Sequence, residues 1–141
     1  DEASLAIEQS EELVKGCILL VEDQMINQLI AEAIIKQNGY SCVIANNGQE
    51  ALDKLNAEPS RFHLVFMDCQ MPIKDGYTTT RNIRAGEAGE AYRSIPMVAM
   101  TANAMKGDRE KCTEAGMDDY ISKPISPEVV EEKMTTWCLK K

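Results

Sequence analysis

Residues 64–68 read Leu64-Val65-Phe66-Met67-Asp68, an apolar run that ends in a carboxylate. A short apolar run bounded by turn signals predicts a strand that is buried on both faces. The turn signals are Pro72 and Asp75-Gly76, which follow the run closely. A carboxylate at the carboxyl end of such a strand can act as a nucleophile or a metal ligand if other polar groups converge on it. Asp68 is therefore the first candidate for a functional residue.

Three further apolar runs also end in polar side chains. Residues 17–21 lead to Glu22 and Asp23, residues 95–100 lead to Thr101, and residues 120–122 lead to Lys123. In an open parallel sheet the carboxyl ends of the strands meet at one edge, which is where ligands bind. Carboxylates, a hydroxyl and an amine at that edge indicate a phosphoryl-transfer site.

Segments with helical periodicity separate these runs. Apolar residues recur at intervals of three and four over residues 25–34, and Asn38-Gly39 is a good stop for that helix. The other predicted elements are a strand over 42–45, a helix around 51–55, helices over about 76–84 and 106–115, and a last helix that starts at Ser126-Pro127-Glu128. Five strand and helix pairs predict a doubly wound α/β domain with a five-stranded parallel sheet. Residues 85–94 carry two glycines and no periodicity, which predicts a mobile surface loop or a helix extension.

Composition restricts the class of protein. A chain of 141 residues is large enough for one domain with a single substantial core. The net charge of -8 argues against non-specific attraction to nucleic acid or to an anionic membrane. The five cysteines form an odd set without a C-x-x-C pair, so we predict reduced and mostly buried thiols.

The leading segment differs in character from the rest of the chain. Residues 1–15 carry five acidic side chains against one lysine, and we predict that they form an acidic linker or remnant before a domain at 16–141. The segment lacks the basic start and apolar stretch of a secretory signal. No stretch approaches the about 20 apolar residues that span a bilayer.

Several carboxylates at one sheet edge require a cation. Like charges raise one another's pKa and burial adds to this, so Glu22, Asp23 and Asp68 stay ionised together only if a cation joins them. Oxygen ligands without a nearby histidine suit a hard divalent ion, and Mg2+ is the default because it needs few protein ligands. With Lys123 as a second positive charge and Thr101 as a hydrogen-bond donor, the Asp68 carboxylate can attack a phosphorus atom and form an acyl phosphate.

The same residues resemble the response-regulator receiver domain, the phosphoacceptor module of two-component phosphorelay signalling. The motifs that carry the resemblance are Glu22-Asp23, Asp68 with Met71-Pro72 and Asp75-Gly76, Ala99-Met100-Thr101-Ala102, and Lys123-Pro124. They cover about residues 16–138, and their details are most similar to the receivers of hybrid sensor histidine kinases. The resemblance implies a flavodoxin-like (βα)5 fold with strand order 2-1-3-4-5.

The resemblance also implies a role for each residue of the site. Asp68 would be the phosphorylated residue, Asp23 a direct Mg2+ ligand and Glu22 a ligand through water. The backbone carbonyl of Gln70 would complete the protein ligands. Lys123 and Thr101 would hold the phosphoryl oxygens, and the Lys123-Pro124 peptide bond would be cis.

A conformational switch is implied as well. Thr101 would move toward the phosphate while Tyr120 turns inward, and Gln70 and Asn103 would tune the lifetime of the acyl phosphate. The alternative for Tyr120 is a half-buried strand residue whose hydroxyl faces water.

The implied partners are proteins that carry a phosphohistidine. A histidine kinase dimerisation and phosphoacceptor domain, or a histidine phosphotransfer domain, would dock beside the first helix around Asn27 and Ile30 and at the loop Met71–Lys74. We expect no contact with nucleic acid or membrane, and a cytoplasmic location, either alone or as the cytoplasmic part of an inner-membrane sensor kinase. The domain would promote its own phosphotransfer and dephosphorylation; whether the parent protein is a hybrid histidine kinase stays open.

Two other interpretations stay open at this point. A haloacid-dehalogenase-like, magnesium-dependent phosphatase would need a second aspartate two residues after its nucleophile, and that position holds Gln70, which cannot act as a general acid. A binding module of the same fold that is never phosphorylated is the third interpretation. The complete acid cluster, together with Thr101 and Lys123, argues against it.

Overall fold

A computed structural model describes residues 16–69, 71, 75–102 and 106–138, except for the side chains of 106–108. Its elements are β1 (Cys17–Val21), α2 (Met25–Gln37), β2 (Ser41–Ala45), α3 (Gly48–Ala57), β3 (Phe62–Asp68), α4 (Gly76–Arg84), η1 (Glu90–Tyr92), β4 (Met97–Thr101), α5 (Lys106–Ala115), β5 (Asp119–Ser122) and α6 (Pro127–Cys138). The strands form one parallel sheet in the order β2-β1-β3-β4-β5. The predicted doubly wound, flavodoxin-like fold and its strand order are confirmed.

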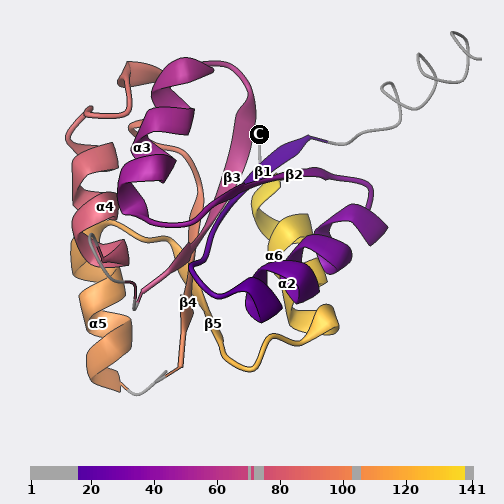
Figure 1. Ribbon diagram of the computed structural model, residues 1–141. Helices are drawn as coiled ribbons and strands as arrows, with labels where there is room; N and C mark the ends of the chain where they lie inside the picture. Colours follow the sequence, from indigo (N-terminus) through magenta and orange to yellow (C-terminus); the bar gives the residue numbers. More distant parts are fainter. Residues whose placement is uncertain (1–15, 70, 72–74, 103–105, 139–141) are drawn as a thin grey trace, which may run out of the picture.

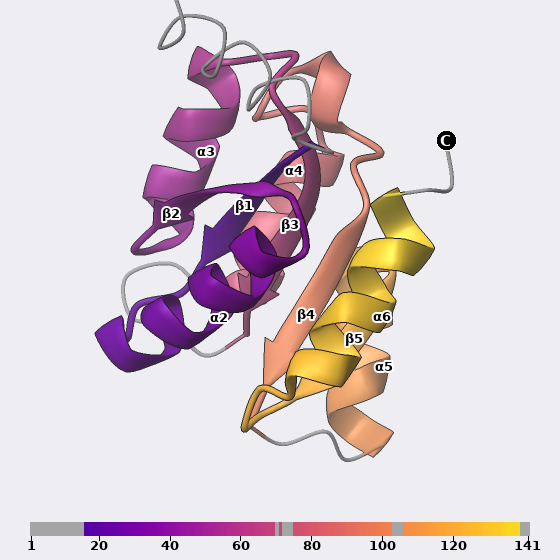
Figure 2. The same ribbon diagram turned by 90° about the vertical axis from the view of Figure 1, so that its right-hand side faces the viewer.

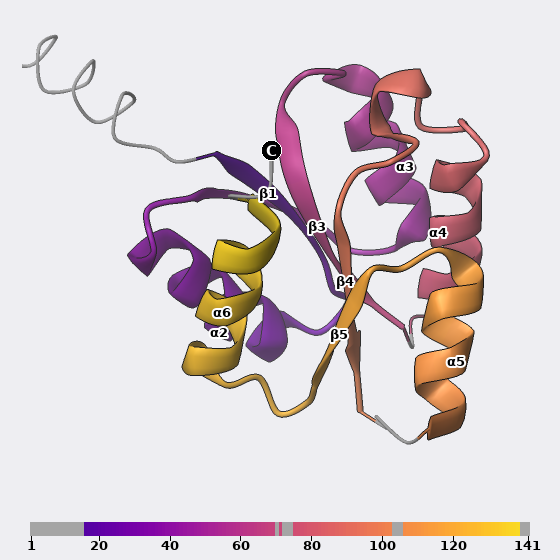
Figure 3. The same ribbon diagram turned by 180° about the vertical axis from the view of Figure 1, so that it is seen from behind.

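Helices cover both faces of this sheet. In Figures 1 and 2, α2 and α6 lie side by side on one face, whereas α3, α4 and α5 lie on the other, which Figure 3 shows from behind. Every residue of β1 and β4 is buried, which is why these strands read as continuous apolar runs. Successive strand residues point to opposite faces, so Leu19 and Val65 pack with the α3 side while Ile18 and Leu20 pack with the α2 side.

The strand order changes direction between β1 and β3. From β1 the chain crosses to β2 at one edge of the sheet, and β3 then pairs with the other side of β1. A crevice forms at the carboxyl ends of strands where such a reversal occurs. Glu22 directly follows β1 and Asp68 ends β3, so both acids lie at this switch point.

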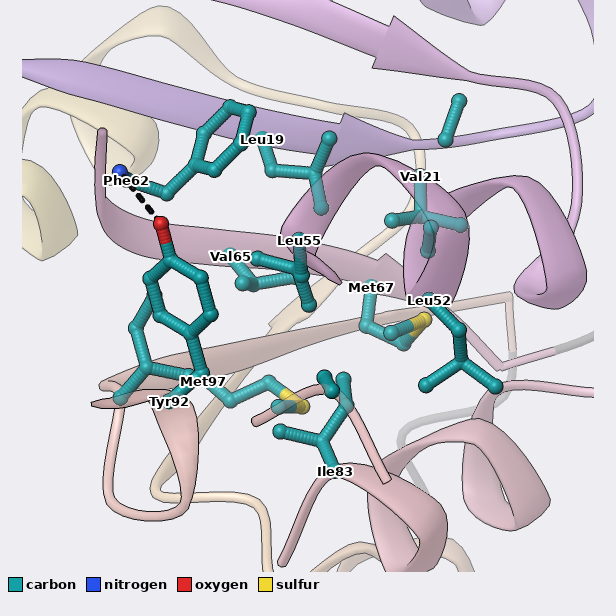
Figure 4. Close-up of a cluster of buried hydrophobic side chains, with 14 of the residues drawn as sticks. Leu19, Val21, Leu52, Leu55, Phe62, Val65, Met67, Ile83, Tyr92 and Met97 are labelled. Carbon is teal, nitrogen blue, oxygen red and sulfur yellow. Dashed lines mark hydrogen bonds between the residues drawn. The ribbon is translucent and has the colours of Figure 1, made fainter. Parts of the chain in front are cut away.

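The segment 85–94 lies on the surface, as predicted, but a buried side chain anchors it. Ala88 and Tyr92 are buried, and the ring of Tyr92 lies in the hydrophobic cluster shown in Figure 4. The Tyr92 hydroxyl donates to the backbone carbonyl of Glu58 and accepts from the backbone N–H groups of Arg61 and Phe62, at 3.1 and 3.2 Å. Turns and a short 3-10 helix make up the segment and most of its residues are exposed, so the predicted surface loop is confirmed, whereas its mobility stays a prediction. The buried tyrosine anchors this loop to residues far away in sequence.

Other predictions concern the cysteines, the leading segment and the membrane. All five cysteines are free thiols, and Cys17, Cys69 and Cys112 are buried, as predicted. Residues 1–15, the predicted linker, lie outside the described residues. None of the helices that the structure describes has the length and apolar character needed to cross a bilayer.

Candidate functional site

Four strand ends deliver polar side chains to the switch point. Asp68 and Thr101 are the last residues of β3 and β4, Glu22 and Asp23 follow β1, and Lys123 follows β5. Ligand oxygens of Glu22, Asp23 and Asp68 lie within 4.8 Å of one another. Glu22 and Asp68 are buried, whereas Asp23 is partly exposed. The structure thus brings together the three acids that the sequence placed at one sheet edge.

The turn after Asp68 requires a glycine. Asp75 caps α4, because its Oδ1 accepts from the backbone N–H of Thr78 at 2.7 Å. A Cβ atom added at Gly76 would lie 2.3 Å from the backbone carbonyl oxygen of Asp68, which is closer than real contacts allow. Glycine therefore lets the start of α4 pack directly against the end of β3, and this contact fixes the backbone of Asp68.

Lys123 is the cation of the cluster. Its Nζ lies 3.1 Å from Glu22 Oε1 and 3.1 Å from Asp68 Oδ1. The backbone N–H of Lys123 donates to the carbonyl oxygen of Thr101 at 2.8 Å, so the end of β4 holds the lysine in place. The two carboxylates are 0% and 1% exposed, which strengthens their attraction to the ammonium group.

Burial and charge shift the pKa values of this cluster. Burial, reinforced by the neighbouring Glu22 carboxylate, raises the pKa of Asp68 to about 7 against the opposing effect of Lys123. Burial alone would lower the pKa of Lys123, but the Asp68 and Glu22 carboxylates outweigh it and raise that pKa. The lysine is therefore charged at neutral pH, while Asp68 is poised between its two protonation states.

The donor set fits a hard divalent cation. Three carboxylates and one ammonium group leave two negative charges when all are ionised, and a divalent ion neutralises them. All candidate side-chain ligands in the cluster are oxygens, as Mg2+ prefers. Burial first, and then the Glu22 carboxylate, raise the pKa of Asp68, and a bound cation would oppose both effects.

The structure describes two of the other predicted site residues, Thr101 and Tyr120. Thr101 is buried at the end of β4. Tyr120 is half-buried on β5, with the Arg109 guanidinium 5.1 Å from its ring centroid, and it packs against the cluster on the α5 side of the sheet. Gln70 and Asn103 lie outside the described residues. The Lys123-Pro124 peptide bond is cis, as predicted.

Two contacts to Glu22 were not foreseen from the sequence. The backbone N–H of Gln24 donates to Glu22 Oε2 at 3.1 Å, and the Gln28 side chain donates to the Glu22 carbonyl oxygen at 2.7 Å. The signal in the sequence was a polar residue in the first turn of a helix that directly follows an acid pair. Which group the Gln28 side chain reaches depends on the relative positions of two strand ends, and sequence periodicity does not give those positions.

We expect the metal-free protein to lose stability as pH rises from about 4 to about 8, because the window runs from the ordinary pKa of Asp68 through its raised folded pKa. The folded pKa of Asp68 is raised above its ordinary value, so the native state binds the extra proton and its stabilisation disappears as pH rises through the folded pKa. Lys123 stays charged throughout this window because its pKa is also raised. Mg2+ competes with that proton, so its affinity should increase over the same range.

Urea unfolding at several pH values, with and without Mg2+, measures both effects. Asp68→Asn should flatten the pH dependence, since it removes the titrating carboxyl. A metal-free stability that increases with pH in the native protein and in Asp68→Asn alike would contradict the assignment of Asp68.

The fold and the site together define a class of protein. The protein is an α/β domain with a flavodoxin-like sheet, and three clustered acids, a lysine and a threonine lie at the switch point of that sheet. The sequence model of the response regulator receiver domain matches residues 18–135, and the chain belongs to this family, a domain of two-component signalling.

Similar proteins include hybrid histidine kinases. The chain is 37% identical over 132 residues to hybrid signal transduction histidine kinase I of Dictyostelium discoideum, covering 92% of this chain and 8% of that protein. It is 36% identical over 120 residues to sensor histidine kinase GacS of Pseudomonas protegens, covering 85% of this chain and 13% of that protein. The chain therefore spans only a small part of the length of these relatives.

Two solved structures are close in fold and sequence. The receiver domain of sensor histidine kinase PA1611 from Pseudomonas aeruginosa, with magnesium coordinated in its active-site cleft, is 39% identical with a TM-score of 0.78, covering 87% of this chain and 97% of that one. A second match is the co-crystal structure of the receiver domain of Ssk1 from Saccharomyces cerevisiae with the histidine phosphotransfer protein Ypd1. It has 31% identity and a TM-score of 0.77, and the match covers 89% of this chain and 90% of that one.

Proposed function

We propose that this domain is a Mg2+-dependent phosphoacceptor, which receives a phosphoryl group from a phosphohistidine onto Asp68 and so relays or switches a two-component signal. The observation that carries the proposal is the position of Asp68, buried between two further acids and Lys123 at the switch point of the sheet. The magnesium ion in the PA1611 receiver supports it. In this proposal residues 1–15 are a linker, residues 16–141 are the receiver, and the location is the cytoplasm.

The three acids would hold the metal. Asp23 and Asp68 would bind it directly, Glu22 through water, and the backbone carbonyl of Gln70 would add a further ligand. A bound Mg2+ ion would neutralise charge on the carboxylates and on the incoming phosphoryl group. The Glu22 carboxylate is already oriented without a metal, because it accepts a hydrogen bond from the backbone of Gln24 and pairs with Lys123.

The remaining residues would act on the phosphoryl group. A carboxylate oxygen of Asp68 forms a bond to phosphorus while the bond between phosphorus and the donor histidine nitrogen breaks. Lys123, 3.1 Å from Asp68 Oδ1, would hold one phosphoryl oxygen, and the Thr101 hydroxyl would donate to another. Movement of Thr101 would free space for Tyr120 to turn inward, and Gln70 and Asn103 would set the lifetime of the product.

The donor would dock on an exposed apolar surface of α2. In the part of the chain that the structure describes, the exposed large apolar side chains are Met25, Ile26, Leu29 and Ile30, at 44 to 72% exposure. We call these four residues the α2 apolar surface. They lie at the start of α2, directly after Glu22 and Asp23, and Asn27 lies among them. A contiguous apolar patch beside a site is typical of a protein interface.

This position suits a partner that must bring its histidine to the site. Both kinds of donor, the dimerisation domain of a histidine kinase and a histidine phosphotransfer domain, are helical and can pack an apolar helix face against this surface. The Ypd1 complex with the Ssk1 receiver and the hybrid kinases among the relatives support such partners. Met71 is buried in the core cluster on the α3 side of the sheet, so its side chain is not part of the α2 apolar surface. Residues 72–74 of the predicted docking loop lie outside the described residues.

Ile26→Glu and Ile30→Glu should each slow transfer from a phosphorylated protein donor by about tenfold or more, because a charge would be buried in an apolar contact. Modification by acetyl phosphate should change by less than about twofold, since a small donor needs no docking. Rates are measured with radiolabelled donor protein and by intact mass. Gln49→Glu, which adds the same charge to an exposed position on α3, is the control. Equal slowing with both donors would refute the docking surface.

The proposal itself is tested by incubating the native chain with acetyl phosphate, with and without Mg2+, and following the intact mass. One phosphoryl group should appear, and only when Mg2+ is present. Failure to gain it under any condition would reject the phosphoacceptor function. Rapid turnover of unrelated phosphate esters would instead favour a phosphatase.

A further inference from the structure

The side chain of Gln28 bridges the ends of two strands. Its Nε2 donates to the backbone carbonyl oxygen of Glu22 at 2.7 Å, just beyond β1, and to Oδ1 of Asn46 at 2.8 Å, just beyond β2. A backbone carbonyl can only accept, so this contact fixes which end of the Gln28 amide faces the strands. Both hydrogens of the amide nitrogen are thereby used.

The bound carbonyl has a particular place in the chain. It belongs to the peptide group between Glu22 and Asp23, two of the acids in the cluster. A peptide group is planar and turns as a unit, so the direction of this oxygen sets ψ of Glu22 and φ of Asp23 together. These two angles set where the Asp23 side chain lies relative to the Glu22 side chain. The donor on Gln28 therefore controls the plane from which two candidate metal ligands project.

The rest of Glu22 is held by independent contacts. Its N–H donates to the carbonyl oxygen of Ala45 at 3.0 Å, which continues the pairing of β1 with β2. Its carboxylate accepts from Gln24 and pairs with Lys123. The contact with Gln28 acts on the peptide group that leads to Asp23.

The far end of the bridge is anchored on α3. The backbone N–H and the side-chain amide of Asn46 donate to Glu50 Oε1 at 3.3 and 3.2 Å. The N–H of Glu50 in turn donates to Asn47 Oδ1, the cap of α3, at 2.9 Å. Gln28 itself is fixed at its backbone, because its N–H donates to the carbonyl of Gln24 at 3.0 Å. The amide is therefore held at both ends before any ligand binds.

We infer that Gln28 is a positioning residue for the cation site, which orients the Glu22-Asp23 peptide group and couples the metal affinity of the acids to the start of α3. This inference rests on the proposed function, since it requires that the acids bind Mg2+. Gln28 itself would bind neither the metal nor the phosphoryl group. Residues that orient metal ligands in this way typically contribute 10 to 100-fold to affinity, in order of magnitude.

The test is a calorimetric titration of Mg2+ into the unphosphorylated protein. Gln28→Met keeps the length of the side chain and removes its donors, and should weaken Mg2+ binding by about tenfold. Asn46→Ala removes the outer acceptor, together with the side-chain donor to Glu50, but keeps the bond from Gln28 to Glu22. It should weaken binding by about two- to threefold, in the same direction. Gln49→Met, the same substitution at an exposed position of α3, should leave the affinity unchanged. Thermal unfolding without Mg2+ checks that each variant is folded.

A second measurement separates positioning from chemistry. The rate of modification by acetyl phosphate in Gln28→Met should return to within about twofold of the native rate when Mg2+ is saturating. A rate that stays about tenfold low at saturation would overturn the positioning role. Equal Mg2+ affinity of folded Gln28→Met and Gln49→Met would overturn the inference while the proposed function stands. If the native protein binds no Mg2+, both fail.

Discussion

Asp68→Asn should abolish the gain of a phosphoryl group from acetyl phosphate and from a phosphorylated protein donor. The amide keeps the shape of the side chain but is a poor nucleophile, so no acyl phosphate can form. The same variant should be more stable than the native protein without Mg2+ at pH 8, by on the order of 2 kcal/mol, because an acid with a raised pKa has been removed from a buried cluster. At pH 4, close to the ordinary pKa of an aspartate, the difference should nearly vanish.

Intact mass and urea unfolding measure these two effects on one sample. The ion pair of Lys123 with Glu22 is kept in this variant, so the gain in stability reports on Asp68 alone. Asp53→Asn is the matched control, because Asp53 is exposed on α3, and it should change neither quantity. A Mg2+-dependent phosphoryl gain that persists in Asp68→Asn would mean that another residue is the acceptor.

Lys123→Met should slow modification by acetyl phosphate by about a hundredfold or more, since a preorganised charge beside the acceptor is lost. It should also destabilise the metal-free protein by about 3 kcal/mol at pH 8, because two buried carboxylates lose their cation. At pH 5 the loss should be smaller, since Asp68 can accept a proton. Added Mg2+ should restore much of the stability at pH 8, because a divalent ion replaces the missing charge.

Chemical unfolding with and without Mg2+, together with rates from intact mass, tests this expectation. Lys36→Met is the control: Lys36 forms an exposed ion pair with Glu32 at 3.7 Å, and its loss should cost less than about 1 kcal/mol. A native rate of modification in Lys123→Met would remove the lysine from the proposed site. Unchanged stability at pH 8 would show that the ammonium group does not offset the buried acids.

The fold could be predicted from the sequence because its central strands β1, β3 and β4 are buried on both faces. The runs before Glu22 and Asp68 read as apolar without interruption, and caps such as Asp75 mark the helix starts. Once the sheet is parallel, strand ends meet at one edge by geometry, so the acids could be grouped without knowing any distance. In these strands and helices, the apolar runs and helix caps predicted the same structure as the parallel topology.

The features that could not be predicted depend on contacts between distant segments. Tyr92 bonds to backbone groups of residues 58–62, and nothing near residue 92 indicates that target. Gln28 reaches the ends of β1 and β2, whose separation is a tertiary quantity. Gly76 was visible as a helix start, but the close approach to the Asp68 carbonyl that requires glycine appears only in three dimensions.

The division of the core into two clusters has a consequence for how a signal can pass through the domain. The α2 apolar surface belongs to the helix that packs on one cluster, whereas Tyr120 packs against the other, and the sheet stands between them. A rearrangement around Tyr120 therefore need not repack the support of α2. In the proposed function, the sheet would separate the face that receives the donor from the face that Tyr120 rearranges. A donor could then stay bound on α2 while the opposite face changes the surface that it offers to another protein.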